Sequence, residues 1–277
     1  MHTRQTIGEL LERGGLAPRR DLGQNFVADA NTVRRIARLA EVGPGDRVVE
    51  IGAGLGSLTL ALAETGATVL AVEVDHGVVP LLREVTAPHT NVTVVEGDAM
   101  RLDWDSVLGD HDDWVLVANL PYNVATPLVC DLLDGVPRIQ RMLVMVQLEA
   151  AERFCAAPRT PQYGAVTVKV SYWATARIAG IVPASVFVPR PNVESALADI
   201  RRLPSPATDA PRDEVFLLVR TAFQQRRKML RRSLAALVPP AAFEAAGIDA
   251  TRRPEELTVV EWGRLADARR DTGSVTP

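Results

Sequence analysis

The sequence has very little cysteine, no long apolar run and no excess of positive charge. Only Cys130 and Cys155 occur among its 277 residues, with no C-x-x-C spacing, so neither a disulfide framework nor a metal site is expected. No stretch of about 18 apolar residues is present, and no charged segment followed by an apolar one opens the chain. We therefore expect a cytoplasmic protein that does not span a membrane.

The composition is that of a globular protein, with 47% hydrophobic and 23% charged residues. The formal net charge of −3 excludes a uniformly basic surface. Any binding of nucleic acid must therefore come from a local basic patch.

Short β-branched runs alternate with helical stretches from Asp46 to Gln147, which is typical of a parallel sheet covered on both faces. Strands are predicted at Arg47–Ile51, Thr68–Glu73, Val92–Glu96, Val115–Ala118 and Met142–Val146. Helices are predicted at Leu58–Ala63, Gly77–Glu84, Pro127–Leu133 and Glu149–Cys155. Val166–Trp173 and Ala196–Ile200 are predicted to form a late antiparallel strand pair, which would complete a mixed sheet of seven strands.

A segment with three prolines, Leu203–Pro211, cannot continue a helix or a central strand. It predicts a Rossmann-like α/β domain over residues 1–203, a linker over 204–211, and a small all-α domain over 212–277. The helices of the second domain are predicted at Glu214–Phe223, Lys228–Leu237, Ala241–Ala246 and Val259–Ala268.

The first predicted strand runs directly into a glycine turn that contains Gly52, Gly54 and Gly56. Serine stands where the dinucleotide fingerprint needs its third glycine, so a pyrophosphate site is disfavoured. Glu73 and Asp98 end the next two strands, where carboxylates can accept hydrogen bonds from a ribose and from an adenine amine. The glycines alone could form only a tight turn, but together the three strand ends favour S-adenosylmethionine.

The fourth strand ends in Asn119-Leu120-Pro121-Tyr122. The exocyclic amine of adenine is a poor nucleophile because its lone pair is delocalised into the ring. The side-chain oxygen of Asn119, with the carbonyl of Leu120 or Pro121, can accept the two N–H protons and localise that lone pair. Tyr122 offers a face for an unstacked base. The alternative is a β-turn with a tyrosine that caps the core, but the sequence favours methylation of adenine N6.

Seven segments together resemble the small-subunit ribosomal RNA adenine dimethyltransferases, the family linked to kasugamycin sensitivity. They are Leu22–Val27, Glu50–Gly56, Glu73–Asp75, Gly97–Ala99, Asn119–Asn123, Phe187–Ser195 and Phe223–Leu230. The resemblance covers nearly the whole chain. The one departure is Val27, where leucine is usual.

The resemblance implies which residues of this chain hold the cofactor and the base. The implied cofactor residues are Asn25, Val27, Gly52, Glu73, Asp98 and Asn119. Asn119, Leu120, Pro121 and Tyr122 would act on the base, and Phe187 would sandwich the flipped adenine from the other side. The implied reaction is N6,N6-dimethylation of two adjacent adenosines in the 3′-terminal hairpin loop of 16S rRNA, in immature 30S subunits, by a monomer.

Six basic residues lie between Arg220 and Arg232, with no acidic residue between Glu214 and Glu244. Pairs at i, i+4 predict a broad basic stripe on a helix, which would bind RNA phosphates. The predicted RNA-binding residues are Arg226, Arg227, Lys228, Arg231 and Arg232, and Arg19 and Arg20 could add to them. A solvated helix face is the alternative.

Three other functions fit some of these motifs. A large-subunit adenine methyltransferase of the macrolide-resistance type shares most of them, and an adenine DNA methyltransferase could use the same chemistry. The third is a non-catalytic ribosome-assembly factor that retains the fold. By resemblance, Leu22-Gly23-Gln24 and Asn119-Leu120-Pro121-Tyr122 favour the small-subunit enzyme over the large-subunit one. The small C-terminal domain disfavours a DNA methyltransferase, and the presence of Asn119, Tyr122, Glu73 and Asp98 favours activity.

Overall fold

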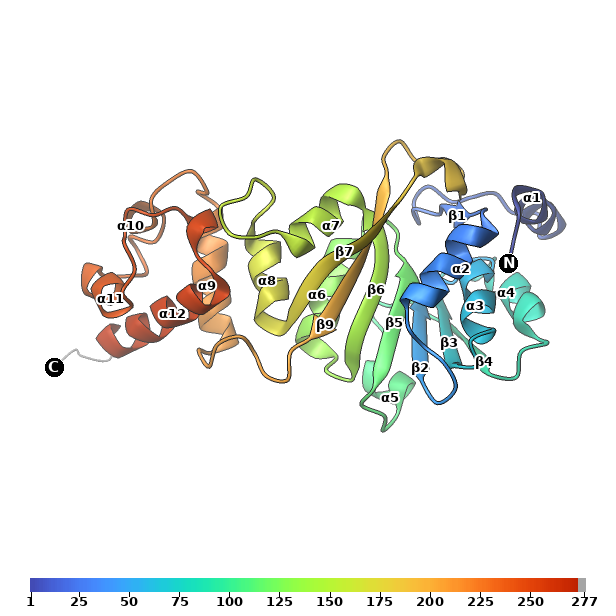
Figure 1. The fold of residues 1–277 in the computed structure, drawn as a ribbon, viewed down its shortest axis with the longest axis horizontal. Coiled ribbons are helices and arrows are strands. Elements are labelled where there is room, and N and C mark those ends of the chain that lie inside the picture. The colour runs from blue at the N-terminus through green and yellow to red at the C-terminus, as the bar shows by residue number, and fades with distance from the viewer. Residues whose placement is uncertain (274–277) are drawn as a thin grey trace. The chain divides into compact units, whose positions relative to one another are not determined.

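The computed structural model describes residues 1–273, so the last four residues of the predicted helical domain lie outside the described range. It divides into two units, drawn in Figure 1. Unit 1 contains residues 1–151 and 177–202, and unit 2 contains residues 152–176 and 203 onward.

The centre of unit 1 is a mixed sheet of seven strands in the order β4-β3-β2-β5-β6-β9-β7. Its parallel strands are β2 (Arg47–Ile51), β3 (Thr68–Glu73), β4 (Val92–Glu96), β5 (Trp114–Asn119) and β6 (Ile139–Gln147). β9 (Ser195–Arg202) pairs antiparallel with β6. This confirms the five predicted parallel strands, and the seven-stranded sheet.

The strand order places a topological switch point between β2 and β5. From β2 the chain proceeds to β3 and β4 on one side, and then returns to continue with β5 and β6 on the other. Ligands of open α/β sheets bind outside the carboxyl ends of strands at such a point. The ends that meet there carry Gly52 and Asn119.

Three predicted helices of unit 1 are confirmed, as α3 (Ser57–Ala63), α4 (Val79–Thr86) and α6 (Ala125–Gly135). The helices α2 (Ala30–Leu39) and α5 (Trp104–Leu108) were not predicted. Buried side chains of α2 and α3 pack with apolar residues of β2, β3, β5 and β6 in one core cluster. Figure 1 shows α2 in front of the sheet near β2.

A helix and a short strand that sequence patterns did not predict precede this sheet. α1 (Arg4–Arg13) begins at Thr3, whose side chain accepts a hydrogen bond from the N–H of Thr6. Its buried face packs on residues of α4 and its preceding turn, Val78 and Leu81. β1 (Phe26–Val27) then pairs antiparallel with β8 (Phe187–Val188), which follows the 3₁₀ turn η1 (Ala184–Val186).

The prediction of a strand at Val166–Trp173 is wrong. These residues form α8 (Ala165–Trp173), and the strand comes next, as β7 (Ala174–Val182). Valine, tyrosine and tryptophan residues gave the segment a β-like composition. Burial of Val168, Val170 and Tyr172 overrides that weak preference, because the helix packs against α9 (Arg212–Phe223).

Unit 2 is all-α. Its remaining elements are the end of α7 (Leu148–Cys155), α10 (Leu230–Ser233), α11 (Pro240–Ala245), the 3₁₀ turn η2 (Pro254–Glu256) and α12 (Val259–Gly273). The predicted helix over Lys228–Leu237 is thus only four residues long. No helix within residues 1–273 has the length and the apolar composition needed to cross a membrane.

The structure groups the chain differently from the predicted domains, because residues 152–176 belong to unit 2. Tyr163 and Tyr172 are buried in the same core cluster as Trp262. Their hydroxyls donate to the carbonyls of Leu257, at 2.6 Å, and Ala210, at 3.1 Å. The proline-rich segment 204–211 is therefore held against α8 and is not an extended linker.

Candidate active site

A pocket lies over the carboxyl ends of β2 and β5. Gly52 and Gly54 adopt φ values of +73° and +55°, which other residues rarely tolerate. A Cβ on Gly52 would lie 3.6 Å from the carbonyl oxygen of Asn119, in the space between the two strand ends. The predicted site residues that line this pocket are Asn25, Val27, Gly52, Gly54, Glu73, Asn119, Leu120, Pro121 and Tyr122.

Gly56, predicted as a cofactor residue, is not among the residues that line the pocket. It precedes α3 with φ +85°, and a Cβ there would lie 3.0 Å from Cδ1 of Leu82. The glycine is therefore explained by the left-handed turn and by close packing against α4.

Glu73 is almost fully buried at the end of β3. Its Oε2 accepts the N–H of Gly54 at 2.7 Å, and its Oε1 accepts the N–H groups of Val74 and Asp75. Burial raises the pKa of the Glu73 carboxyl, and these three donors oppose that shift. The carboxylate is thus fixed against the glycine turn, with one lone pair on Oε2 left for a ligand.

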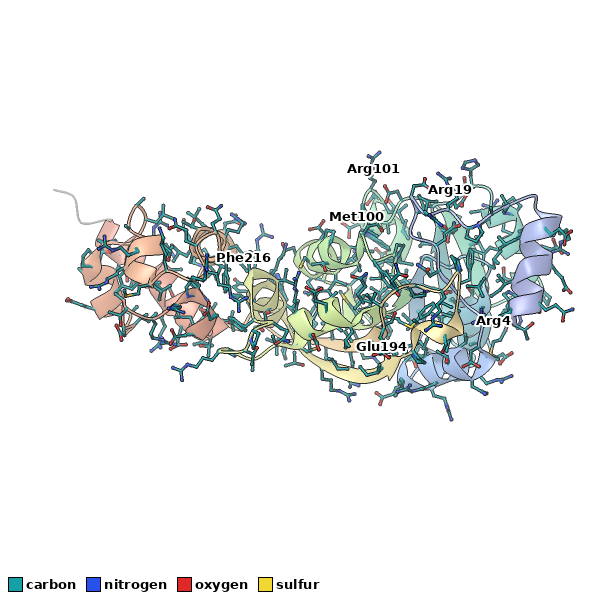
Figure 2. All side chains as sticks on the ribbon, turned by 90° about the horizontal axis from the view of Figure 1, so that it is seen from above. Arg4, Arg19, Met100, Arg101, Glu194 and Phe216 are labelled. Carbon is teal, nitrogen blue, oxygen red and sulfur yellow. The ribbon has the colours of Figure 1, made fainter. Side chains whose placement is uncertain are left out.

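Asp98 lies in a second pocket that adjoins the first, because Gly52, Val74 and Pro121 line both. Its Oδ1 accepts the N–H of Met100 at 3.0 Å. Exposed apolar side chains, Val74 and Met100, flank this second pocket. Figure 2 shows Met100 on the same side of unit 1 as Arg19. Glu73 and Asp98 therefore line two adjoining pockets.

The side-chain amide of Asn119 has a defined orientation. Its Nδ2 donates to the main-chain carbonyl of Asn25 at 2.9 Å. Rotating the amide by half a turn would place two acceptors against each other. The Oδ1 atom is therefore the one left to accept a hydrogen bond from a substrate.

The next residues supply a second acceptor and an aromatic ring. The carbonyl of Pro121 accepts the N–H groups of Val124 and Ala125, whereas within residues 1–273 no such bond reaches the carbonyl of Leu120. This favours Leu120 over Pro121 as the second acceptor. The hydroxyl of Tyr122 lies 2.8 Å from Oγ of buried Ser195, and burial raises the pKa of that phenol.

Phe187, implied by resemblance to sandwich the base, is not at the pocket. Its side chain is 0% exposed and belongs to the core cluster with Val27 and Val182. The register of β1 and β8 pairs it with Val27. The structure therefore brings Phe187 next to a pocket residue but presents its ring to the core.

Two titratable residues are among the pocket residues that the sequence did not predict. Glu50 is 1% exposed, and no hydrogen bond reaches its Oε2 within residues 1–273. Burial raises its pKa to about 8, and the nearby Glu73 adds to the shift. His2 is also buried, and its Nε2 lies 2.7 Å from the carbonyl oxygen of Leu55. The position of Glu50 beside the glycine turn could have revealed it, whereas no local signal pointed to His2.

The predicted basic stripe does not lie on one helix. Residues 224–229 form turns, and the helix that follows contains only Leu230–Ser233. Arg226 is partly buried and pairs with Glu255 at 3.3 Å, so the absence of nearby acids in sequence was misleading. The other four predicted RNA-binding residues are exposed: Arg227, Lys228, Arg231 and Arg232.

The site and the sheet together define a class of protein. A glycine turn at the switch point, carboxylates at the next two strand ends and Asn-Leu-Pro-Tyr at the fourth are the fold and site of S-adenosylmethionine-dependent methyltransferases. Within that class, the chain belongs to the ribosomal RNA adenine dimethylase family, whose sequence profile matches residues 15–269.

Curated relatives align over most of the chain. Ribosomal RNA small subunit methyltransferase A of Thermobifida fusca is 44% identical over 273 residues, which cover 95% of this chain and 94% of that protein. The protein of the same name from Kineococcus radiotolerans is 46% identical, with 95% and 90% covered.

Solved structures agree with the fold. The 23S rRNA methyltransferase ErmE has a TM-score of 0.69 at 27% identity and covers 88% of this chain and 99% of its own. A dimethyladenosine transferase from Plasmodium falciparum has a TM-score of 0.77 at 23% identity, with 88% and 97% covered.

Proposed function

We propose that this chain is a 16S rRNA (adenine-N6)-dimethyltransferase that uses S-adenosylmethionine. Its membership in the ribosomal RNA adenine dimethylase family supports the reaction, and its relatives named small subunit methyltransferase A support the choice of rRNA. The substrate would be two adjacent adenosines in the 3′-terminal hairpin of 16S rRNA in immature 30S subunits, modified in the cytoplasm by a monomer.

The residues present fit this cofactor. Asn25, Val27, Gly52, Glu73, Asp98 and Asn119 would hold it. The unpaired Oε2 of buried Glu50 leaves a polar atom in the pocket for a ligand group. S-adenosylmethionine, when bound, supplies an electrophilic methyl group on a sulfonium.

The chain's own part in the reaction is to hold the amine. Oδ1 of Asn119 and the carbonyl of Leu120 accept hydrogen bonds from its N–H groups, two before the first transfer and one before the second, which directs the nitrogen lone pair away from the ring. Stacking on Tyr122 contributes about 1–3 kcal/mol per base. Alignment of two reactants can lower a barrier by roughly 7–11 kcal/mol, so positioning outweighs proton removal here.

The orientation of the Asn119 amide carries this proposal, because it leaves the oxygen as the free atom. We expect the purified chain to transfer methyl groups from labelled S-adenosylmethionine to immature small subunits. Asn119→Ala should lower kcat by about 10²–10³-fold, the usual cost of removing one positioned hydrogen-bonding group. Its affinity for the subunits, measured by filter binding, should change by only a few-fold, because contacts to RNA phosphates dominate such affinities and only one hydrogen bond to a base is lost.

Wild-type protein that binds subunits but labels no adenosine would leave only a non-catalytic assembly role. Retained methylation by Asn119→Ala would refute the role of that side chain.

A second candidate is a large-subunit adenine methyltransferase, because the fold also resembles the 23S rRNA methyltransferase ErmE at 27% identity. The same assay with bare large-subunit rRNA separates the two. Labelling of immature small subunits alone would support the proposal, and labelling of large-subunit rRNA alone would replace it.

A further inference from the structure

The segment Arg19–Asn25 connects the catalytic asparagine with the end of β3. At one end, the carbonyl of Asn25 accepts the hydrogen bond from Nδ2 of Asn119. The orientation of the Asn119 amide therefore depends on where this segment holds that carbonyl. Asn25 itself begins no regular element, since β1 starts at Phe26.

Gln24 attaches the segment to the turn after β3. Its Nε2 donates to Oδ2 of Asp75 at 2.7 Å, and its Oε1 accepts the N–H of Arg19 at 2.9 Å. Both ends of this carboxamide are thus used, which fixes it in one orientation. The main-chain N–H of Gln24 closes the loop by donating to the carbonyl of Arg19.

Asp75 provides a rigid anchor. It is 4% exposed, and its Oδ1 accepts the N–H of Gly77 at 3.0 Å. Its own N–H donates to Oε1 of Glu73 at 2.9 Å. The turn that fixes Glu73 in the pocket therefore also fixes Gln24.

The segment rests closely on the catalytic motif. Gly23 has φ +62°, and a Cβ there would lie 3.0 Å from Cβ of Pro121 and 3.1 Å from Oδ1 of Asn123. Little space is available for the segment to shift without displacing the carbonyl of Asn25. A change at the Asp75 end is expected to reach Asn119 through this contact.

We propose that Gln24 is a positioning residue for methyl transfer: its hydrogen bond to Asp75 holds the Asn25 carbonyl where it orients the carboxamide of Asn119. This inference rests on the proposed function, because it assigns the purpose of that orientation. Gln24 also lines the pocket, but in this role it touches neither the amine nor the methyl group. It acts through Asn25.

Exchange of the two hydrogen-bonding groups tests the proposal. Gln24→Glu places two carboxylates against each other. In Asp75→Asn, either two amide N–H groups face each other, or the carboxamide of Gln24 turns over and its oxygen no longer accepts the N–H of Arg19. The double variant Gln24→Glu/Asp75→Asn restores the bond in the opposite direction, with the same total charge. A carboxylate at position 24 also still accepts the N–H of Arg19.

We expect each single variant to lower kcat on immature small subunits by about 10–100-fold, as displacement of a reacting group does. The kcat of the double variant should be within about threefold of the wild-type kcat, a difference of less than 1 kcal/mol. The matched control is Gln5→Glu, because Gln5 donates to Glu9 at 2.8 Å on the exposed face of α1. That variant should keep the wild-type kcat.

A second measurement does not depend on activity. The side-chain amide of Asn119 gives a pair of ¹H–¹⁵N signals, identified by their loss in Asn119→Ala. These signals should move in both single variants and return in the double variant. Circular dichroism melting shows whether each variant is folded.

A double variant no better than the single ones, in kcat and in the Asn119 signals, would overturn the proposal. So would single variants that leave both unchanged. Wild-type protein without methyl transfer would instead refute the proposed function, and the NMR comparison would still decide whether Gln24 orients Asn119.

Discussion

Two aromatic residues that resemblance assigns to the target base differ in the structure. Tyr122 lines the pocket, and its hydroxyl is held by Ser195, so its ring is available at a fixed place. Phe187 is fully buried in the main core of unit 1, together with side chains of α2. At the scale of single residues, the two rings should therefore respond to mutation in different ways.

Phe187→Ala should reduce the stability of the fold by about 3–5 kcal/mol, because it leaves a cavity in a packed core. Phe187→Leu keeps most of the side-chain volume, so its loss of stability should be less than about half of the loss caused by Phe187→Ala. Chemical denaturation followed by circular dichroism measures both. Tyr122→Ala is the comparison, since its ring lines the pocket and should affect transfer more than folding. An Ala variant at 187 with unchanged stability would show that the ring is not a core residue.

Most individual site residues could be predicted because parallel strands bring their carboxyl ends to one edge. Glu73 and Asn119 needed only a correct strand assignment. The contact between Gln24 and Asp75 could not be predicted, because 51 residues separate them and each would otherwise pass for a solvated polar residue. The same holds for His2, whose place depends on how α1 folds back onto α4.

At the scale of elements, strands covered on both faces were predicted well, and short segments of mixed character were not. Trp114–Ala118 in β5 is an apolar run without alternation, which is typical of a strand buried on both faces. Val166–Trp173 is also rich in valine and aromatic residues but packs as a helix against α9. Residues 228–237 have helical spacing, yet the main-chain N–H groups of Leu230 and Arg231 bond to the distant segment 250–252. Tertiary contacts therefore determine the secondary structure of both segments.

Two helical glycines allow a matched test of element packing. A Cβ on Gly263 in α12 would collide with Oγ1 of Thr208, which requires displacement of the 204–211 segment. A Cβ on Gly8 in α1 would meet nothing within 4 Å. Gly8→Ala should therefore stabilise the protein by about 0.5–1 kcal/mol, the usual gain in a helix interior. Gly263→Ala should destabilise it.

Thermal unfolding measures the melting temperature of each glycine variant relative to wild type. We expect Gly8→Ala to raise it and Gly263→Ala to lower it. If Gly263→Ala raised the melting temperature as Gly8→Ala does, then close packing of α12 on residues 204–211 would be wrong.

At the scale of the whole molecule, binding of RNA by a chain of net charge −3 must use exposed arginines without acidic partners. Arg231 and Arg232 are exposed; Arg231 lies near enough to Asp249 for its charge to help lower the pKa of that carboxyl, after the larger effects of Thr251, whereas no acidic partner of Arg232 is found within residues 1–273. Their replacement by alanine should weaken binding to immature subunits. The slope of log K against log salt should fall by about 1.5, at roughly 0.7–0.9 for each phosphate that is no longer neutralised.

The control removes the same charge elsewhere in unit 2. Arg212 pairs with Asp213, and Arg264 is exposed on α12. The Arg212→Ala/Arg264→Ala variant should keep most of the salt slope. Equal effects of the two double variants would mean that the 231–232 site has no special part in RNA binding.

The stability of the whole molecule should depend on pH through Glu50. Burial raises the pKa of this carboxyl from its ordinary 4.5 to about 8, so the folded state holds a proton there that the unfolded state releases. The free energy of unfolding therefore falls as pH rises from about 4.5, and it levels off above about pH 8. The total loss is up to roughly 5 kcal/mol, at about 1.4 kcal/mol per pKa unit. Burial also raises the pKa of Glu73, so the wild-type curve of unfolding free energy against pH contains the effects of both carboxyls.

Glu50→Gln isolates the effect of Glu50, because an amide of the same shape does not titrate. Urea denaturation of the cofactor-free protein between about pH 5 and 8.5 should show wild type losing stability relative to the variant as pH rises. The control, Glu96→Gln at the exposed end of β4, should follow wild type throughout. Curves for wild type and Glu50→Gln that stay parallel across this range would mean that Glu50 is already ionised in the folded protein. Its unpaired oxygen would then face a charged partner or water, and not a dry pocket.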